Sequence, residues 1–151
     1  KEVGWGISEQ TARKLASAGV AAIDVARAGG TSWSQVEMYR IASPQAARTA
    51  GAFRGWGIPT VESIINVRNV APGLKIIASG GLKDGVDVAK SLALGACLGG
   101  MAGVFLKTAV ESVEVTIDKI IEFQREIQIS MFAVGAGKLD QLNSSMLVRE
   151  I

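Results

Sequence analysis

Residues 75–85, with the sequence Lys-Ile-Ile-Ala-Ser-Gly-Gly-Leu-Lys-Asp-Gly, decide the fold that we predict for this chain. The continuous apolar run at 76–78 is typical of a parallel strand that is covered on both faces. The run ends in Gly80 and Gly81, after which residues 86–94 are predicted to form a helix. Paired glycines let a bound group approach backbone N–H groups and a helix N-terminus, which suits an anion such as phosphate. Glycines here also occur in tight strand-to-helix turns that bind nothing, so both interpretations stay open at this point.

The same alternation of short strands and helices extends in both directions from this stretch. Strands are predicted at 1–3, 20–26, 76–78 and 96–103, and helices at 9–18, 34–41, 45–53, 61–70, 86–94, 105–109, 113–132 and 139–151. About four strand–helix units predict an α/β fold with a parallel sheet and right-handed crossovers. Four units are half of a (β/α)₈ TIM barrel, so we expect residues 1–151 to be one half-barrel domain. A half-barrel has two bare edge strands, so we expect that another chain completes it or that the rest is missing; bare edges also favour a homo-oligomer.

The composition excludes several classes of protein. The net charge is only +2 and the basic residues are scattered among acidic ones, which argues against a nucleic-acid partner. No apolar run reaches the roughly 18 residues of a membrane span, and no signal peptide opens the chain. The single cysteine, Cys97, excludes an internal disulfide and favours a cytoplasmic location. Because the chain has no histidine, Ser-His catalysis, Cys-His catalysis and a histidine-bearing metal site are excluded from it.

Four segments are predicted to lie at the carboxyl ends of the strands, where parallel strand–helix proteins bind their ligands. They are residues 1–2, 29–32, 80–83 and 100–103. Two successive strands that end in glycine-rich turns match the phosphate site of barrels, which the loops after strands seven and eight form. The joint occurrence of the turns at 80–83 and 100–103 therefore predicts phosphate binding.

Several side chains near these turns have two interpretations each. Thr31 and Ser32 could bind a phosphate or a heterocycle, or cap the helix that follows. Lys1 could pair with an anionic centre and Lys83 could neutralise a phosphate, but both are also typical of solvated surface lysines. An unpaired carboxylate at Asp24 would be costly in mid-strand, so we expect it to face a polar interior or to pair with a lysine of a neighbouring strand. The three tryptophans are expected to be packing anchors: Trp5, Trp33 and Trp56.

Five motifs together carry a resemblance to a known enzyme family. They are Lys-Glu-Val-Gly-Trp-Gly-Ile-Ser at 1–8, Ala-Gly-Gly-Thr-Ser-Trp at 28–33, Trp-Gly-Ile-Pro-Thr at 56–60, Ser-Gly-Gly-Leu at 79–82 and Gly-Met-Ala at 100–102. In this order and at this spacing they closely resemble the flavin-dependent type 2 isopentenyl diphosphate isomerase family. The resemblance runs through essentially the whole chain and covers the C-terminal half of that enzyme.

The resemblance implies a TIM barrel that holds FMN and interconverts isopentenyl and dimethylallyl diphosphate in isoprenoid biosynthesis. In the family the reduced flavin does acid–base work, NAD(P)H supplies the reduction, and Mg²⁺ bridges to the diphosphate. By position, Lys1 and Thr31 would contact the flavin ring system. The phosphate end of FMN would be held by Gly81, Leu82, Lys83, Ala102 and Gly103.

The family's substrate-binding arginine and histidine and its magnesium-binding glutamate belong to the half that this chain lacks. No catalytic residue and no metal ligand can therefore be assigned here. Two positions depart from the family pattern: Arg27 stands where a glycine is usual, and Cys97 stands where an acid is usual.

Two other interpretations compete with this one. A different FMN barrel, of the 2-hydroxy-acid oxidase or IMP dehydrogenase group, would share the glycine turns but needs a catalytic histidine or cysteine in its active-site loops. The absence of histidine, and the place of Cys97 at the start of a predicted strand, argue against it. The second alternative is a catalytically inactive half-barrel that associates through its bare edges.

Overall fold

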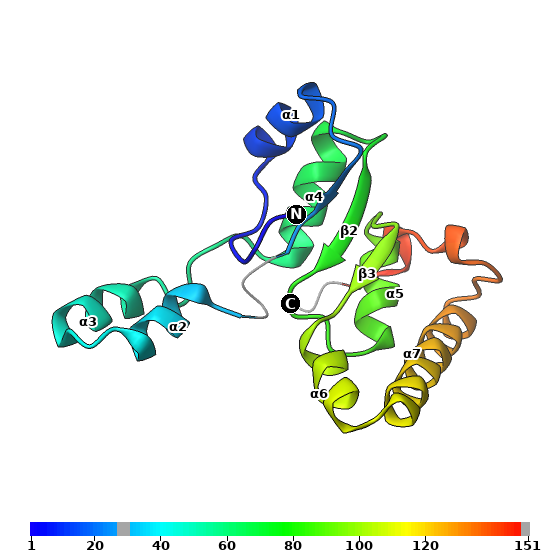
Figure 1. Ribbon diagram of the computed structural model, residues 1–151. Coiled ribbons are helices and arrows are strands. Elements are labelled where there is room, and N and C mark those ends of the chain that lie inside the picture. The colour runs from blue at the N-terminus through cyan, green and yellow to red at the C-terminus, as the bar shows by residue number, and fades with distance from the viewer. Residues whose placement is uncertain (27–30, 149–151) are drawn as a thin grey trace.

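The computed structural model describes residues 1–26 and 31–148. Its centre is a sheet of three parallel strands in the order β1-β2-β3, formed by Ala22–Asp24, Lys75–Ser79 and Leu98–Gly100 (Figure 1). The register pairs Ile23 with Ile76 and Ala78 with Gly99. All three strands therefore end at the same edge of the sheet, which brings the predicted glycine turns together.

Helices surround this sheet in three groups. The helices are α1 (Glu9–Ser17), α2 (Trp33–Arg40), α3 (Pro44–Ala52), α4 (Thr60–Val70), α5 (Gly85–Ala93), α6 (Gly103–Glu111) and α7 (Val113–Ala133). Helices α1 and α4 pack together beside β2, and α5, which packs on β3, forms a second group with α6 and α7. Helices α2 and α3 pair with each other and extend away from the sheet as a hairpin, which has no buried residue (Figure 1).

The main core lies between the sheet and helices α1 and α4. Ile76 and Ala78 alternate along β2 and are fully buried, as are Ile64 and Val67 one turn apart on α4. This spacing places one face of the strand against one face of the helix. The strand predicted at 76–78 is therefore confirmed, but its burial on both faces only in part, since Ile77 on the opposite face is half-buried.

Short polar side chains determine where most of the helices begin. At five helix N-termini the side chain of the N-cap residue accepts a hydrogen bond from a backbone N–H of the first turn. These residues are Ser8, Ser32, Ser43, Asp84 and Ser112. Seven of the eight predicted helices occur in the structure, with bounds that differ by a few residues.

Three predictions of secondary structure were wrong in part. Residues 1–3 form no strand, although the backbone N–H of Glu2 donates to the carbonyl of Asp24 at 3.0 Å and so begins a ladder beside β1. The strands predicted at 20–26 and 96–103 are only three residues long, because pairing extends no further along β2. The helix predicted from residue 139 is replaced, within the described residues, by two short 3₁₀ helices, η1 (Leu139–Gln141) and η2 (Ser144–Met146).

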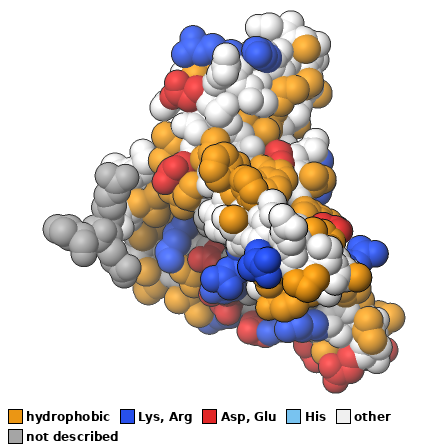
Figure 2. Space-filling view, turned by 90° about the vertical axis from the view of Figure 1, so that its left-hand side faces the viewer, with side chains coloured by type: hydrophobic (Ala, Val, Ile, Leu, Met, Phe, Trp, Pro, Cys, Tyr) orange, Lys and Arg blue, Asp and Glu red, His pale blue; other side chains and the backbone are white. Residues whose placement is uncertain are grey.

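The surface carries many apolar side chains. On the face shown in Figure 2 they gather in the middle, with Lys, Arg, Asp and Glu side chains around them. Leu98 on β3 and Phe132 on α7 are 58% and 86% exposed. Among the described residues, none of the helices is both long enough and apolar enough to cross a lipid bilayer.

Candidate functional site

A cleft of about 960 Å³ opens at the carboxyl ends of the three strands. Its walls come from the first residues of the chain, the ends of β1, β2 and β3, the start of α2, and helices α6 and α7. The structure places all seven residues predicted to contact a cofactor in the lining of this one cleft: Lys1, Thr31, Gly81, Leu82, Lys83, Ala102 and Gly103. The edge of the sheet thus brings together segments that are about a hundred residues apart.

The turn after β2 forms one wall. Gly80 and Gly81 both have φ of +89°, a backbone conformation that favours glycine. The Thr60 hydroxyl donates to the Gly80 carbonyl at 2.7 Å, which fixes the first peptide of the turn against α4. The turn therefore has a defined shape, and it brings backbone rather than side chains to the cleft surface.

The N-terminus of α5, expected to face a bound anion, is instead covered by the protein's own carboxylates. Asp84 accepts from the backbone N–H of Asp87 at 2.8 Å, and Glu126 accepts from the N–H of Gly85 at 2.5 Å. Asp87 in turn accepts from the N–H of Lys83 at 3.1 Å. These donors are taken, so the prediction of a free helix N-terminus directly after the Gly80–Gly81 turn was wrong.

The N-terminus of α6 fits that role better. Its N-cap residue is Ala102, and no side chain among the described residues caps it. A Cβ atom added at Gly103 would meet no heavy atom within 4 Å, so the cleft is open in front of the first turn. Uncapped N–H groups and the positive end of the helix dipole favour an anion at this place.

Lysines give the cleft a positive charge. Lys83, Lys107 and Lys119 all line it, and Lys107 lies one turn along α6 from Gly103. Lys119 pairs with Glu122 of α7 and is 30% exposed. Several ammonium groups around an uncapped helix N-terminus suit a doubly charged phosphate better than a neutral ligand.

Lys1 and Asp24 form an ion pair across the strand ends. The ammonium of Lys1 donates to Asp24 Oδ2 at 2.9 Å and to Ser79 Oγ at 3.3 Å. The Asp24 side chain is 15% exposed, whereas the Lys1 side chain is 59% exposed. The expected pairing of Asp24 with a lysine is confirmed, although Lys1 belongs to no strand. Its ammonium is held by these contacts even though most of its side chain is exposed.

The segment around Thr31 and Trp33 closes one end of the cleft. Ser32 accepts from the backbone N–H of Gln35 at 3.4 Å, which confirms the helix-capping interpretation of Ser32. The indole N–H of Trp33 donates to the carbonyl of Val3 at 2.7 Å.

The tryptophans are not buried anchors: the exposed fractions of Trp5, Trp33 and Trp56 are 36%, 50% and 64%.

Arg27, Gly29 and Gly30 lie outside the described residues.

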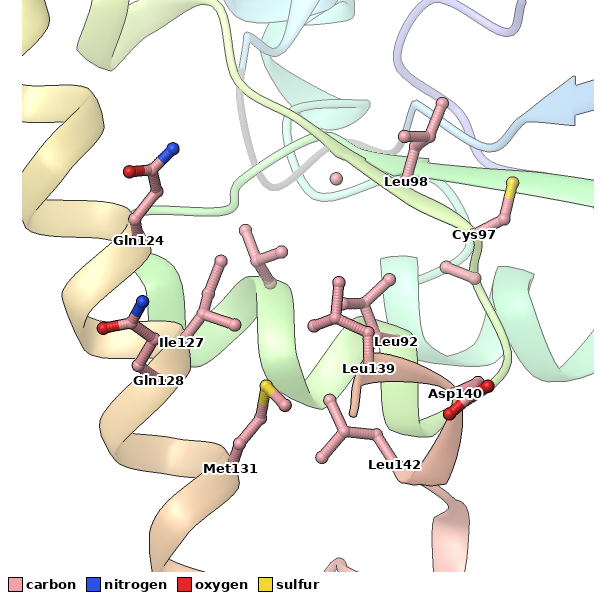
Figure 3. A pocket seen from close by; sticks show the side chains of 13 residues that line it. Leu92, Cys97, Leu98, Gln124, Ile127, Gln128, Met131, Leu139, Asp140 and Leu142 are labelled. Carbon is pink, nitrogen blue, oxygen red and sulfur yellow. The ribbon is translucent and has the colours of Figure 1, made fainter. Parts of the chain in front are cut away.

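A second pocket, of about 850 Å³, lies on the other side of β3, between α5 and α7. Figure 3 shows Leu92, Leu139 and Leu142 gathered there, with Met131 of α7 opposite them. Cys97 lines this pocket rather than the cleft. None of the residues predicted to bind a cofactor lies in it.

Sequence reasoning missed several residues of the cleft. Among them are Trp33, Ser79, Val104, Lys107, Thr108 and Lys119 as lining residues. The helical spacing from Gly103 to Lys107 could have indicated Lys107, because residues four apart share a helix face. Lys119 carries no such signal, since only the packing of α7 brings it to the cleft. Within residues 1–26 and 31–148, His, Cys, Asp and Glu side chains form no group of three or more that could hold a metal ion.

Curated relatives of this chain are similar along nearly its whole length. The isopentenyl-diphosphate delta-isomerase of Nostoc sp. is 50% identical over 145 residues, which are 96% of this chain and 41% of that protein. The enzyme of the same name from Oceanobacillus iheyensis is 44% identical over 148 residues, or 98% of this chain and 42% of that protein. The chain thus spans about two fifths of the length of these relatives.

The fold is also similar to that of a solved flavoprotein. A mutant flavocytochrome b2 with benzoylformate superposes with a TM-score of 0.65 at 20% identity, covering 97% of this chain and 36% of that one. The family model described as FMN-dependent dehydrogenase matches residues 6–149. The chain therefore belongs to the FMN-dependent dehydrogenase family.

Proposed function

We propose that this chain is the FMN-binding part of an isomerase that interconverts isopentenyl diphosphate and dimethylallyl diphosphate. The observation that carries the proposal is the cleft at the strand ends, whose lining includes all seven residues that the family resemblance assigns to the flavin. Relatives that are 50% and 44% identical and bear the name of this isomerase support the choice of reaction.

The residues of the cleft fit FMN in shape and charge. We assign the phosphate to the N-terminus of α6 at Ala102 and Gly103, facing the turn at Gly81, Leu82 and Lys83. Open space in front of Gly103 leaves room for the phosphate group.

The ring system is assigned to the other end of the cleft, beside Lys1 and Thr31. Bound and reduced, FMN would supply the acid–base centre of the isomerisation. The contribution of this chain is to hold and orient it: backbone N–H groups bind one end and the Lys1 ammonium lies at the other.

The family resemblance alone suggests NAD(P)H as the reductant, Mg²⁺ as the bridge to the substrate diphosphate, and a cytoplasmic location. The described residues do not fit a magnesium site, because their acidic side chains form no cluster. We therefore assign no magnesium ligand and no substrate-binding residue to this chain.

Titration of the purified chain with FMN, followed by flavin fluorescence, tests the proposal. We expect saturable binding at micromolar FMN or tighter. Riboflavin, which lacks the phosphate, should bind at least tenfold more weakly, because it cannot use the α6 N-terminus or the lysines. Equal affinity for the two flavins would contradict the phosphate assignment, and no binding of either would refute the proposed cofactor site for this chain.

We also propose that the chain is a half-barrel that pairs with a second copy of itself. Among the described residues no strand lies beside the outer edge of β3, and at the other edge residues 1–3 contact β1 through the hydrogen bond from Glu2 N–H to the Asp24 carbonyl. In this dimer a twofold rotation would set β3 of one copy beside residues 1–3 of the other. The exposed Leu98 on β3 would then be covered.

Light scattering after size exclusion, with and without FMN, tests this association. A dimer mass is expected, and Leu98→Lys should shift it toward the monomer because it places a charge at the new strand pair. A monomer at high micromolar concentration would refute the pairing.

A further inference from the structure

The most completely hydrogen-bonded polar group of the cleft is the carboxylate of Asp24. Its Oδ2 atom accepts from Lys1 Nζ at 2.9 Å. Its Oδ1 atom accepts from the Ser79 hydroxyl at 2.5 Å and from the backbone N–H of Ala26 at 3.2 Å. Lys1 Nζ also donates to Ser79 Oγ at 3.3 Å, which closes a triangle of three side chains.

The triangle joins three separate segments at the carboxyl ends of the strands. Lys1 precedes α1, Asp24 ends β1 and Ser79 ends β2. Asp24 and Ser79 are largely buried on rigid strands, whereas the Lys1 side chain is long and 59% exposed. Asp24 and Ser79 are therefore held in place by the strands, whereas the Lys1 side chain depends on its contacts with them for a defined position.

An ammonium group has three N–H donors, and Asp24 and Ser79 take two of them. All three residues line the cleft, so the remaining donor is available to a ligand there. A lysine held at its tip loses less conformational freedom when it binds a ligand than a free surface lysine does.

We propose that Asp24 and Ser79 are positioning residues that hold the Lys1 ammonium at one end of the cleft. That the ammonium contacts the flavin ring rests on the proposed function. That Asp24 and Ser79 restrain Lys1 does not rest on it, because these contacts form within the chain itself. The competing explanation is that Asp24 and Ser79 only attach residues 1–3 to β1, which we call fastening. The two explanations make different predictions.

Lysine acetylation of the cofactor-free chain, read by mass spectrometry, measures the hold directly. Asp24→Asn and Ser79→Ala should each raise the acetylation rate of the Lys1 ε-amine by about threefold or more relative to Lys107. Glu37→Gln removes a carboxylate that pairs with Arg40 on α2, outside the cleft, and should leave the ratio unchanged. Thermal unfolding shows whether each variant is folded. An unchanged ratio in folded Asp24→Asn and Ser79→Ala would overturn the proposal.

A double-mutant cycle on FMN affinity then separates positioning from fastening. Asp24→Asn should weaken FMN binding by about three- to tenfold in the parent chain, in keeping with a charged but partly exposed hydrogen bond. In the Lys1→Met background, Asp24→Asn should weaken FMN binding by less than about twofold, because the ammonium group that Asp24 positions is no longer present. Equal weakening in both backgrounds would overturn the proposal in favour of fastening. If the parent chain binds no FMN, the proposed function fails, and the acetylation ratio still decides whether Asp24 and Ser79 hold Lys1.

Discussion

Gly81→Asp should abolish FMN binding while the chain stays folded. Gly81 has φ of +89°, so a side chain there costs about 1–2 kcal/mol of stability. That is a fraction of the roughly 5–15 kcal/mol by which domains are stable. In the proposed complex the new carboxylate faces the FMN phosphate. At about 6 Å and an effective dielectric constant near 20, two unit negative charges repel by about 3 kcal/mol. This repulsion corresponds to about a hundredfold in Kd for each phosphate charge.

Gly135→Asp is the matched control. Gly135 follows α7 with φ of +73°, and a Cβ atom there would meet no heavy atom within 4 Å. The control carries the same backbone penalty and the same charge, but it lies outside the cleft lining. Flavin fluorescence titrations and thermal unfolding would be measured for both variants. If folded Gly81→Asp bound FMN within threefold of the parent chain, the phosphate assignment at this turn would be wrong.

Three further changes test the fold. Ile64→Ala removes a fully buried side chain and should lower the free energy of unfolding by about 2–5 kcal/mol in urea titrations; a loss below 1 kcal/mol would contradict the assigned core. Gly6→Ala should also lower the unfolding temperature, because its Cβ atom would lie 2.4 Å from the Ile58 carbonyl oxygen at φ of +78°; an unchanged temperature would show that the two segments do not pack so closely. Hydrogen bonds from its own backbone N–H and from the Ser112 hydroxyl hold the pKa of Glu114 below its ordinary 4.5. These contacts therefore stabilise the fold above pH 4.5, and this stabilisation is lost as the pH falls through the lowered pKa. Ser112→Ala should raise this pKa, and an NMR titration that shows no change would refute the contact.

Local patterns in the sequence were enough to predict most of the secondary structure. The apolar run before Gly80 and Gly81 predicted β2, and the apolar spacing along residues 113–132 predicted α7 to within one residue. These signals are local, because a helix makes its hydrogen bonds within itself and a buried strand needs apolar side chains on both faces. Strand length was not predictable in the same way. It depends on where the chain leaves its neighbour: β1 pairs only with Lys75–Ile77 although β2 continues to Ser79, so β1 proved to be three residues rather than seven.

The region from residue 139 onward marks another limit of local patterns. Its weak apolar pattern predicted a helix, but η1 and η2 are single turns, and Leu139 and Leu142 instead line the pocket beside α5. Packing against α5 and α7 replaced the few hydrogen bonds that a weak, short helix would have made.

The sequence by itself determined the parallel α/β architecture and the two glycine-rich turns, because both are encoded in runs of adjacent residues. Only the tertiary structure decided which helix N-terminus is open. The carboxylates of Asp84 and Glu126 cover α5, and Glu126 belongs to α7, about forty residues along the chain. It also decided the partner of Lys1, because Asp24 and Ser79 meet the ammonium only once the ends of β1 and β2 lie beside the first residue of the sequence. Charges and hydrogen-bond donors in a cleft act over a few ångströms of space, and distances along the chain do not specify them.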